Sequence, residues 1–157
     1  MTKVLFVCLG NICRSPTAEG VFRKMVADAG LSHVIQTDSA GTGSWHVGSP
    51  PDRRAAAEAK RRGIDISDLR GRQARRADFE RFDYILAMDR TNYEDLRDIC
   101  PPGKEDRLHM FLDFAPGHKE RDVPDPYYGG GDGFRRVYDL VEAAAAGLLA
   151  EIRPREV

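Results

Sequence analysis

Short apolar runs alternate along the chain with longer segments in which apolar residues recur every three or four positions. The runs are rich in β-branched and aliphatic residues and predict strands at 3–9, 33–39, 83–88 and 107–112. The helical spacing predicts helices over 15–30, 52–63, 90–98 and 134–152, with a short helical turn at 78–81. Strands that alternate with helices are typical of α/β proteins. We therefore predict an α/β fold, a single three-layer domain over residues 1–157, with a central four-stranded parallel sheet and helices on both faces.

The charge balance leaves the predicted fold unchanged and argues against two kinds of partner. The 157 residues include 24 Lys and Arg against 25 Asp and Glu, so the formal net charge is −1. Such a chain has no overall field that would hold it on nucleic acid or on an anionic membrane, and we expect neither as a partner. The apolar run at the beginning ends at Asn11, Arg14 and Glu19, too early for a signal peptide or a membrane span. We expect a cytoplasmic protein.

The cysteines do not form a pattern that would bind metal or build a disulfide framework. There are three, Cys8, Cys13 and Cys100, with no C-x-x-C pair and no His at ligand spacing. We therefore expect no metal and no cofactor, and we consider each cysteine separately.

The segment 8–15, CLGNICRS, connects the first predicted strand to the first predicted helix, which we expect Ser15 to cap. Open α/β sheets bind ligands at the carboxyl ends of their strands. Successive backbone N–H groups and the helix dipole make such a turn an anion site. Arg14 follows at a spacing that lets its guanidinium grip two oxygens of a phosphate while the sulfur of Cys8 faces the phosphorus.

The same surroundings predict the chemistry of Cys8. The helix dipole and Arg14 are expected to lower the pKa of its thiol to about 3.5–7.5, which makes it a thiolate at neutral pH. Ser15 can donate its hydroxyl to that thiolate when sulfur is the leaving group. The alternative is that Cys8 is a small buried hydrophobe at the end of a strand, the commoner fate of an isolated cysteine.

A second candidate group lies in the segment 113–133, where Asp125 precedes Pro126, Tyr127 and Tyr128. A carboxylic acid on such a segment can protonate a departing phenol. The two rings offer an apolar wall that would raise the pKa of the acid and flank an aromatic substrate. The spacing leaves Asp122 and Asp132 as rivals, and an Asp-Pro turn with surface tyrosines is an equally good interpretation of this segment alone.

Several stretches resemble one family. VLFVCLGNICRSPTAEGVF is similar to the signature loop of the low-molecular-weight protein tyrosine phosphatases, and TDSAGT, DYILAMDRTN and DVPDPYYGG resemble its other landmarks. The resemblance implies hydrolysis of phosphotyrosine in proteins through a phosphocysteine, with affinity for phosphate-like anions. It implies that Cys8, Arg14, Ser15 and Asp125 are catalytic. It also implies that substrate is held by Leu9, Gly10, Asn11, Ile12, Cys13, Trp45, Tyr127 and Tyr128.

The resemblance extends to two supporting features. It implies that Ser39 holds the side chain of Asn11, and that Cys13 traps oxidised Cys8 as a disulfide, which makes the enzyme redox-sensitive. Many members carry His-Arg-Ala-Arg-Gln where this chain has Leu69 to Gln73, so a hydrogen bond from that His to Asn11 is not expected here.

Two other functions stay open at this point. An arsenate reductase can share this fold and loop, but it needs further cysteines to pass on a disulfide, and Cys100 alone is poor provision. It also has no use for the Asp125 segment. A non-catalytic phosphotyrosine-binding module is the other, although it would not be expected to keep both the nucleophile and the acid.

Overall fold

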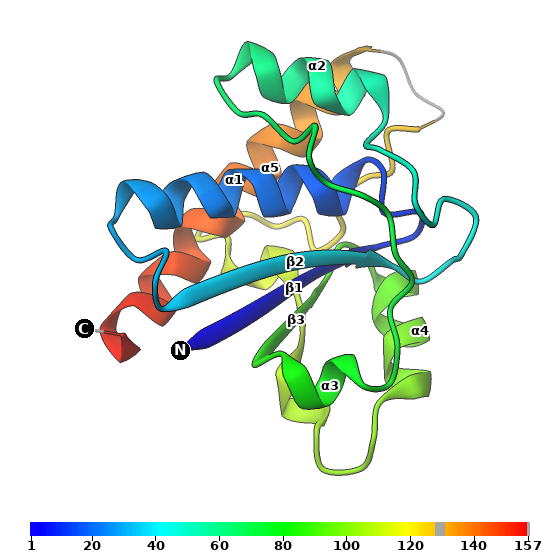
Figure 1. Ribbon diagram of the computed structural model, residues 1–157, viewed down its shortest axis with the longest axis vertical. Coiled ribbons are helices and arrows are strands. Elements are labelled where there is room, and N and C mark those ends of the chain that lie inside the picture. Colours follow the sequence, from blue (N-terminus) through cyan, green and yellow to red (C-terminus); the bar gives the residue numbers. More distant parts are fainter. Residues whose placement is uncertain (128–130, 157) are drawn as a thin grey trace.

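The computed structural model describes residues 1–127 and 131–156 and contains the predicted sheet. Four strands, β1 (Thr2–Cys8), β2 (Ile35–Gly41), β3 (Tyr84–Ala87) and β4 (Leu108–Met110), pair in parallel in the order β2-β1-β3-β4 (Figure 1). The chain passes from β1 through a helix on one face to β2, and from β3 through a helix on the other face to β4. The carboxyl ends of β1 and β3 therefore meet at a switch point, where open sheets bind ligands.

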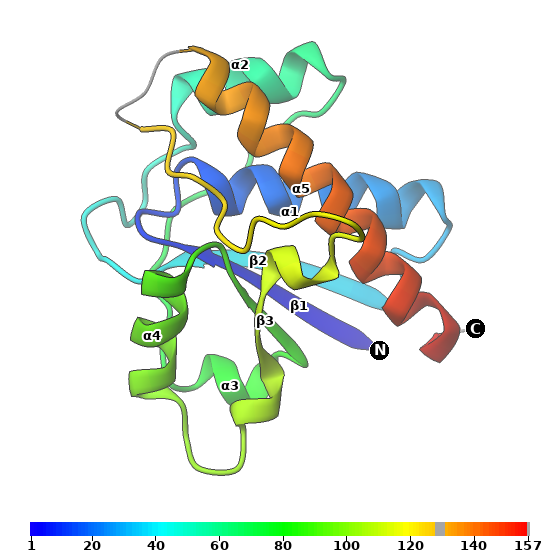
Figure 2. The ribbon, with the colours of Figure 1, turned by 180° about the vertical axis from the view of Figure 1, so that it is seen from behind.

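Helices cover both faces, which confirms the three-layer prediction. On one face lie α1 (Arg14–Asp28), α5 (Gly131–Ile152) and, packed farther out against both of them, α2 (Arg53–Arg61) (Figures 1 and 2). The other face carries α3 (Asp78–Arg81) and α4 (Arg90–Ile99). Short 3-10 turns occupy Glu105–Arg107, Phe111–Phe114 and Arg153–Arg155. No helix in the described ranges is both long and apolar enough to cross a membrane.

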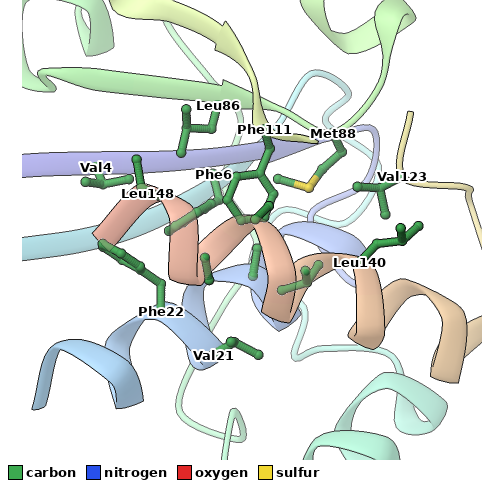
Figure 3. Close-up of a cluster of buried hydrophobic side chains, with 14 of the residues drawn as sticks. Val4, Phe6, Val21, Phe22, Leu86, Met88, Phe111, Val123, Leu140 and Leu148 are labelled. Atoms are coloured by element: carbon green, nitrogen blue, oxygen red, sulfur yellow. The ribbon is translucent and has the colours of Figure 1, made fainter. Parts of the chain in front are cut away.

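The side chains of β1 alternate between two cores. Phe6 packs edge-on against Phe22 of α1 and against Phe111, with ring centroids 5.7 and 5.3 Å apart, in the core beneath α1 and α5 (Figure 3). Leu5 and Val7 belong to the core on the α4 side. Because side chains along a strand alternate between faces, Cys8 follows Phe6 onto the α1 side.

The ends of two helices differ from the prediction. Ser15 is not the cap of the first helix: α1 begins at Arg14, its N-cap is Cys13, and no side chain caps it. The hydroxyl of Ser15 instead lies against the Cys8 sulfur and the Asn11 amide, so tertiary contacts determine this helix start. The last helix begins at Gly131, three residues earlier than its apolar spacing indicates.

Candidate active site

The loop after β1 turns its carbonyl groups outward and its N–H groups inward. Backbone N–H groups of the 42–52 segment donate hydrogen bonds of 2.8–2.9 Å to three loop carbonyls, those of Cys8, Leu9 and Ile12. Within the described part of the chain, several loop N–H groups have no acceptor: those of Gly10, Ile12, Cys13 and Arg14. Since these donors lie at the start of α1, they form an anion-binding concavity.

Asn11 holds this loop in shape. Its φ of 58° is the only positive value of a non-glycine residue in the described ranges. Its side-chain amide donates to Ser15 Oγ at 2.8 Å and to Ser39 Oγ at 3.0 Å, so Ser39 lies where the resemblance places it. The Asn11 carbonyl oxygen accepts the backbone N–H of Arg72 at 3.0 Å. The segment with Leu69 in place of His thus still supports Asn11, through its backbone.

The Cys8 side chain lies at the base of the concavity and is 2% exposed. Its sulfur accepts the N–H of Asn11 at 3.2 Å and lies 3.1 Å from Ser15 Oγ. Because the Asn11 amide already donates to Ser15 Oγ, the single hydroxyl proton of Ser15 is left for the sulfur at 3.1 Å or for the Ala40 carbonyl at 3.4 Å. The Asn11 N–H, together with the Ser15 hydroxyl when it turns to the sulfur, stabilises negative charge there.

Arg14 is buried beside Cys8. Its Nη1 donates to Asp89 Oδ2 at 2.6 Å and to the Val123 carbonyl at 3.0 Å, and its Nη2 lies 3.6 Å from Asp125 Oδ2. Burial alone would lower the pKa of this guanidinium, but the charges of Cys8 and Asp89 outweigh it and raise the pKa. Arg14 therefore stays a cation whose Nε and Nη2 edge is available for an anion.

Asp89 is not predicted by the sequence patterns. It lies two residues after the end of β3, whose carboxyl end adjoins that of β1, and this position is the signal that would have found it. Its Oδ1 also accepts the N–H of Asn92 at 2.8 Å and so caps α4. The carboxylate of Asp89 thus links α4, on the other face of the sheet, to Arg14.

The three candidate acids have different partners. Asp122 accepts the N–H of Arg90 at 2.8 Å and so binds the start of α4. Asp132 is 96% exposed beside Arg135. Only Asp125 reaches the cavity, where its Oδ1 accepts the N–H of Tyr127 at 3.0 Å.

One cavity brings most of the predicted residues together. Trp45 and Tyr127, 72% and 40% exposed, contribute aromatic rings to its lining. Among the residues that the structure describes, the lining is Cys8, Leu9, Gly10, Ile12, Cys13, Arg14, Trp45, His46, Asp125 and Tyr127. His46 is not predicted from the sequence, and Asn11 lies behind the lining. Tyr128 lies outside the described residues.

The cysteines separate into two groups. Cys13 shares the cavity with Cys8, and burial, with the nearby charges of Asp52 and Cys8, raises the pKa of the Cys13 thiol to about 12. It is therefore a neutral thiol. Cys100 packs into the core on the α4 side of the sheet, the face opposite Cys8.

Comparisons with known proteins agree with this geometry. The sequence model of the low molecular weight phosphotyrosine protein phosphatases matches residues 3–156. A low molecular weight protein-tyrosine-phosphatase of Streptomyces coelicolor is 46% identical over 96% of this chain and 93% of its own. The crystal structure of a protein tyrosine phosphatase from Entamoeba histolytica, with Hepes in its active site, is 42% identical and covers 100% of both chains with a TM-score of 0.94. The Drosophila arginine phosphatase DARP is 31% identical over 97% of this chain and 98% of its own, with a TM-score of 0.90. The chain belongs to the low molecular weight phosphotyrosine protein phosphatase family and has the hydrolase activity of that family.

Proposed function

We propose that this cavity hydrolyses phosphotyrosine in proteins, with Cys8 as the nucleophile. The observation that carries the proposal is the set of backbone N–H groups without acceptors that surrounds the Cys8 sulfur, closed by Arg14. A phosphoryl group bound there accepts hydrogen bonds at its three equatorial oxygens. Its phosphorus then faces the sulfur.

The first step transfers the phosphoryl group to Cys8. The sulfur attacks in line, the P–O bond to the phenol breaks, and Asp125 gives its proton to the departing oxygen. Arg14 and the loop N–H groups stabilise the charge on the equatorial oxygens. The products are free tyrosine hydroxyl and phosphocysteine.

The second step releases inorganic phosphate. Water attacks the phosphorus while Asp125, now a carboxylate, removes a proton from it. The P–S bond breaks, and the hydroxyl of Ser15, 3.1 Å from the sulfur, stabilises the departing thiolate. Asp125 ends protonated and Cys8 ends as a thiolate, as both began.

The walls of the cavity favour an aromatic leaving group. Leu9, Ile12, Trp45 and Tyr127 line it with apolar surface above a deeply buried sulfur. Phosphoserine is too short to bring its phosphorus to that sulfur. Asp125 is the only acidic residue among the described lining, so a phosphoarginine would find one carboxylate at most for its cationic side chain.

The position of the third cysteine argues against the arsenate reductase. A relay of disulfides needs cysteines that can reach one another. Cys100 packs on the face of the sheet opposite Cys8, and only Cys13 shares the cavity. A binding module without activity, in turn, needs no acid beside the phosphate site, and Asp125 is there.

Substitution of Cys8 and Asp125 tests the proposal. Cys8→Ser should abolish turnover of 4-nitrophenyl phosphate and of a phosphotyrosine peptide, while urea unfolding remains cooperative. Asp125→Ala should lower kcat/KM for phenyl phosphate about 10²–10⁴-fold, and much less for 4-nitrophenyl phosphate, whose phenolate leaves without a proton. Asp132→Ala is the control, because it removes an exposed aspartate at the beginning of α5. Equal losses on both esters would remove Asp125 as the acid, and faster turnover of a phosphoserine or phosphoarginine peptide would overturn the substrate class.

A further inference from the structure

Arg54, in the first turn of α2, is fixed to the loop that holds the nucleophile. Its Nε and Nη2 donate to the two carboxylate oxygens of Asp52, each at 3.2 Å. The backbone N–H of Asp52 donates to the carbonyl of Ile12 at 2.8 Å, one of the outward carbonyls of the loop. The Arg54 guanidinium thus has a defined place relative to Cys8.

The same guanidinium contacts the segment that carries the acid. Its Nη2 donates to the Tyr127 carbonyl at 2.9 Å. Its Cζ atom lies over the rings of Tyr127 and Phe134, 5.4 and 4.8 Å from their centroids, within the range of cation–π attraction. The N–H of Tyr127 in turn donates to Asp125 Oδ1 at 3.0 Å. Figures 1 and 2 both show α2 beside the beginning of α5, where these contacts are made.

We infer that Arg54 is a positioning residue for the general acid and keeps the carboxyl of Asp125 above the leaving oxygen. The inference rests on the role proposed for Asp125. That residue is in neither a helix nor a strand, and its side chain is 37% exposed. Its segment therefore depends on individual contacts for its place.

The contacts lie on both sides of the acid. Before it, Val123 donates its N–H to the Met88 carbonyl at 2.7 Å and accepts from Arg14 at 3.0 Å. After it, Arg54 holds the Tyr127 carbonyl. Removing the contact with Arg54 weakens the support after the acid and leaves in place the backbone hydrogen bond from Asp52 to Ile12 that holds the phosphate loop.

The expected effect is selective for the leaving group. A displacement of a catalytic group by about 1 Å can cost on the order of 10²-fold in rate. Arg54→Gln should therefore lower kcat/KM for phenyl phosphate by about 10–10²-fold. The loss should be much smaller for 4-nitrophenyl phosphate. Arg54→Lys keeps the charge and an ammonium group that can donate hydrogen bonds, but not the planar fork, so its loss should be intermediate.

Two controls separate positioning from a general structural effect. Arg53→Gln removes the neighbouring arginine of the same helical turn, whose side chain is exposed and has no hydrogen bond or ion pair with any residue in the described ranges. The double variant Asp125→Ala/Arg54→Gln removes the group through which Arg54 is inferred to act. On phenyl phosphate it should be no slower than Asp125→Ala alone, since the two effects are not independent.

The inference is supported if the loss in Arg54→Gln is selective for phenyl phosphate, absent in Arg53→Gln, and absent when Asp125 is already Ala. It is overturned by equal losses on both esters, by no loss, or by a loss that persists in the double variant. If Asp125→Ala itself shows no preference between the esters, the assignment of the acid fails first and the inference fails with it. Urea unfolding of each variant shows whether it is folded, and Arg54→Lys provides the test if Arg54→Gln does not fold.

Discussion

Asn11 offers a quantitative test of how the phosphate loop is held. It is 3% exposed and combines a left-handed backbone, φ 58°, with three side-chain hydrogen bonds of 2.8–3.0 Å. Asn11→Ala removes all three bonds and places a residue with a Cβ but no polar group in the left-handed region. Asn11→Gly removes the same bonds and relieves the backbone.

The number of hydrogen bonds lost and the backbone conformation of Asn11 set the expected loss of unfolding free energy. Each buried hydrogen bond contributes about 1 kcal/mol net, so both variants should lose about 3 kcal/mol of unfolding free energy from this source. Alanine pays a further cost of about 1–2 kcal/mol for the left-handed conformation. Glycine avoids that cost but adds about 0.5–1 kcal/mol through the greater freedom of its unfolded chain. We expect Asn11→Ala to be the less stable of the two by up to about 1.5 kcal/mol.

Urea unfolding followed by circular dichroism, with linear extrapolation, measures these differences. Ser39→Ala removes one of the three partners and also the hydrogen bond from Ser39 to Glu19, so this comparison variant should lose about 2 kcal/mol. A second readout is the gain in stability on adding inorganic phosphate, which should be much reduced in both Asn11 variants because the N–H groups no longer converge. A loss below about 1 kcal/mol in Asn11→Ala, or a glycine variant less stable than the alanine variant, would refute the reasoning.

Two further predictions concern buried titratable groups. Peroxide should convert Cys8 to a sulfenic acid, which condenses with the thiol of Cys13 to form a disulfide and release water. Added thiol should then restore activity in the parent and distinctly less activity in Cys13→Ser. Equal recovery of the two proteins would contradict this role of Cys13. Burial, with the charge of Asp38, raises the pKa of Glu19, although hydrogen bonds from Ser39 and Thr37 oppose the shift. The folded state therefore holds this proton to higher pH than the unfolded state, and stability falls as pH rises through the raised pKa. Glu19→Gln should gain stability relative to the parent at about pH 8 and gain less near pH 4, measured by thermal unfolding; a gain independent of pH would count against it.

Most of the fold can be predicted from patterns of neighbouring residues in the sequence. The prediction is wrong where contacts between distant residues determine the structure. The strand at 3–9 is apolar on both faces, which is enough to place it inside a parallel sheet. The N-cap of α1 is Cys13, two residues before the predicted Ser15, because Ser15 uses its hydroxyl for Cys8 and Asn11 instead of capping the helix. The spacing of neighbouring residues cannot show which hydrogen-bond partner the Ser15 hydroxyl takes.

The residues of the site also fall into two groups, those that a local pattern predicts and those that only the fold brings together. Cys8 and Arg14 are predictable because one loop of eight residues carries the sulfur, the N–H groups and the cation together. Spacing alone leaves three aspartates as candidates for the acid, and the family resemblance favours Asp125. In the structure a partner far along the chain separates Asp122 from the cavity, since it binds the N–H of Arg90, 32 residues earlier. Arg54 was not predicted for the same reason, because its partner Tyr127 is 73 residues away.

Arg14 lies in the cavity, as its loop predicts, but its guanidinium is not placed as the spacing suggests. The spacing of the loop predicts a guanidinium fork that grips two phosphate oxygens. In the structure Nη1 is already bound to Asp89 and to the Val123 carbonyl, at 2.6 and 3.0 Å. A guanidinium has five N–H donors in a rigid plane, so a two-point grip must use the edge formed by Nε and Nη2. Because Asp125 Oδ2 lies 3.6 Å from Nη2, the phosphate and the acid both face this nitrogen, which carries two N–H groups. The cation that holds the phosphate and the carboxyl group that serves the leaving oxygen therefore meet at one edge of the cavity.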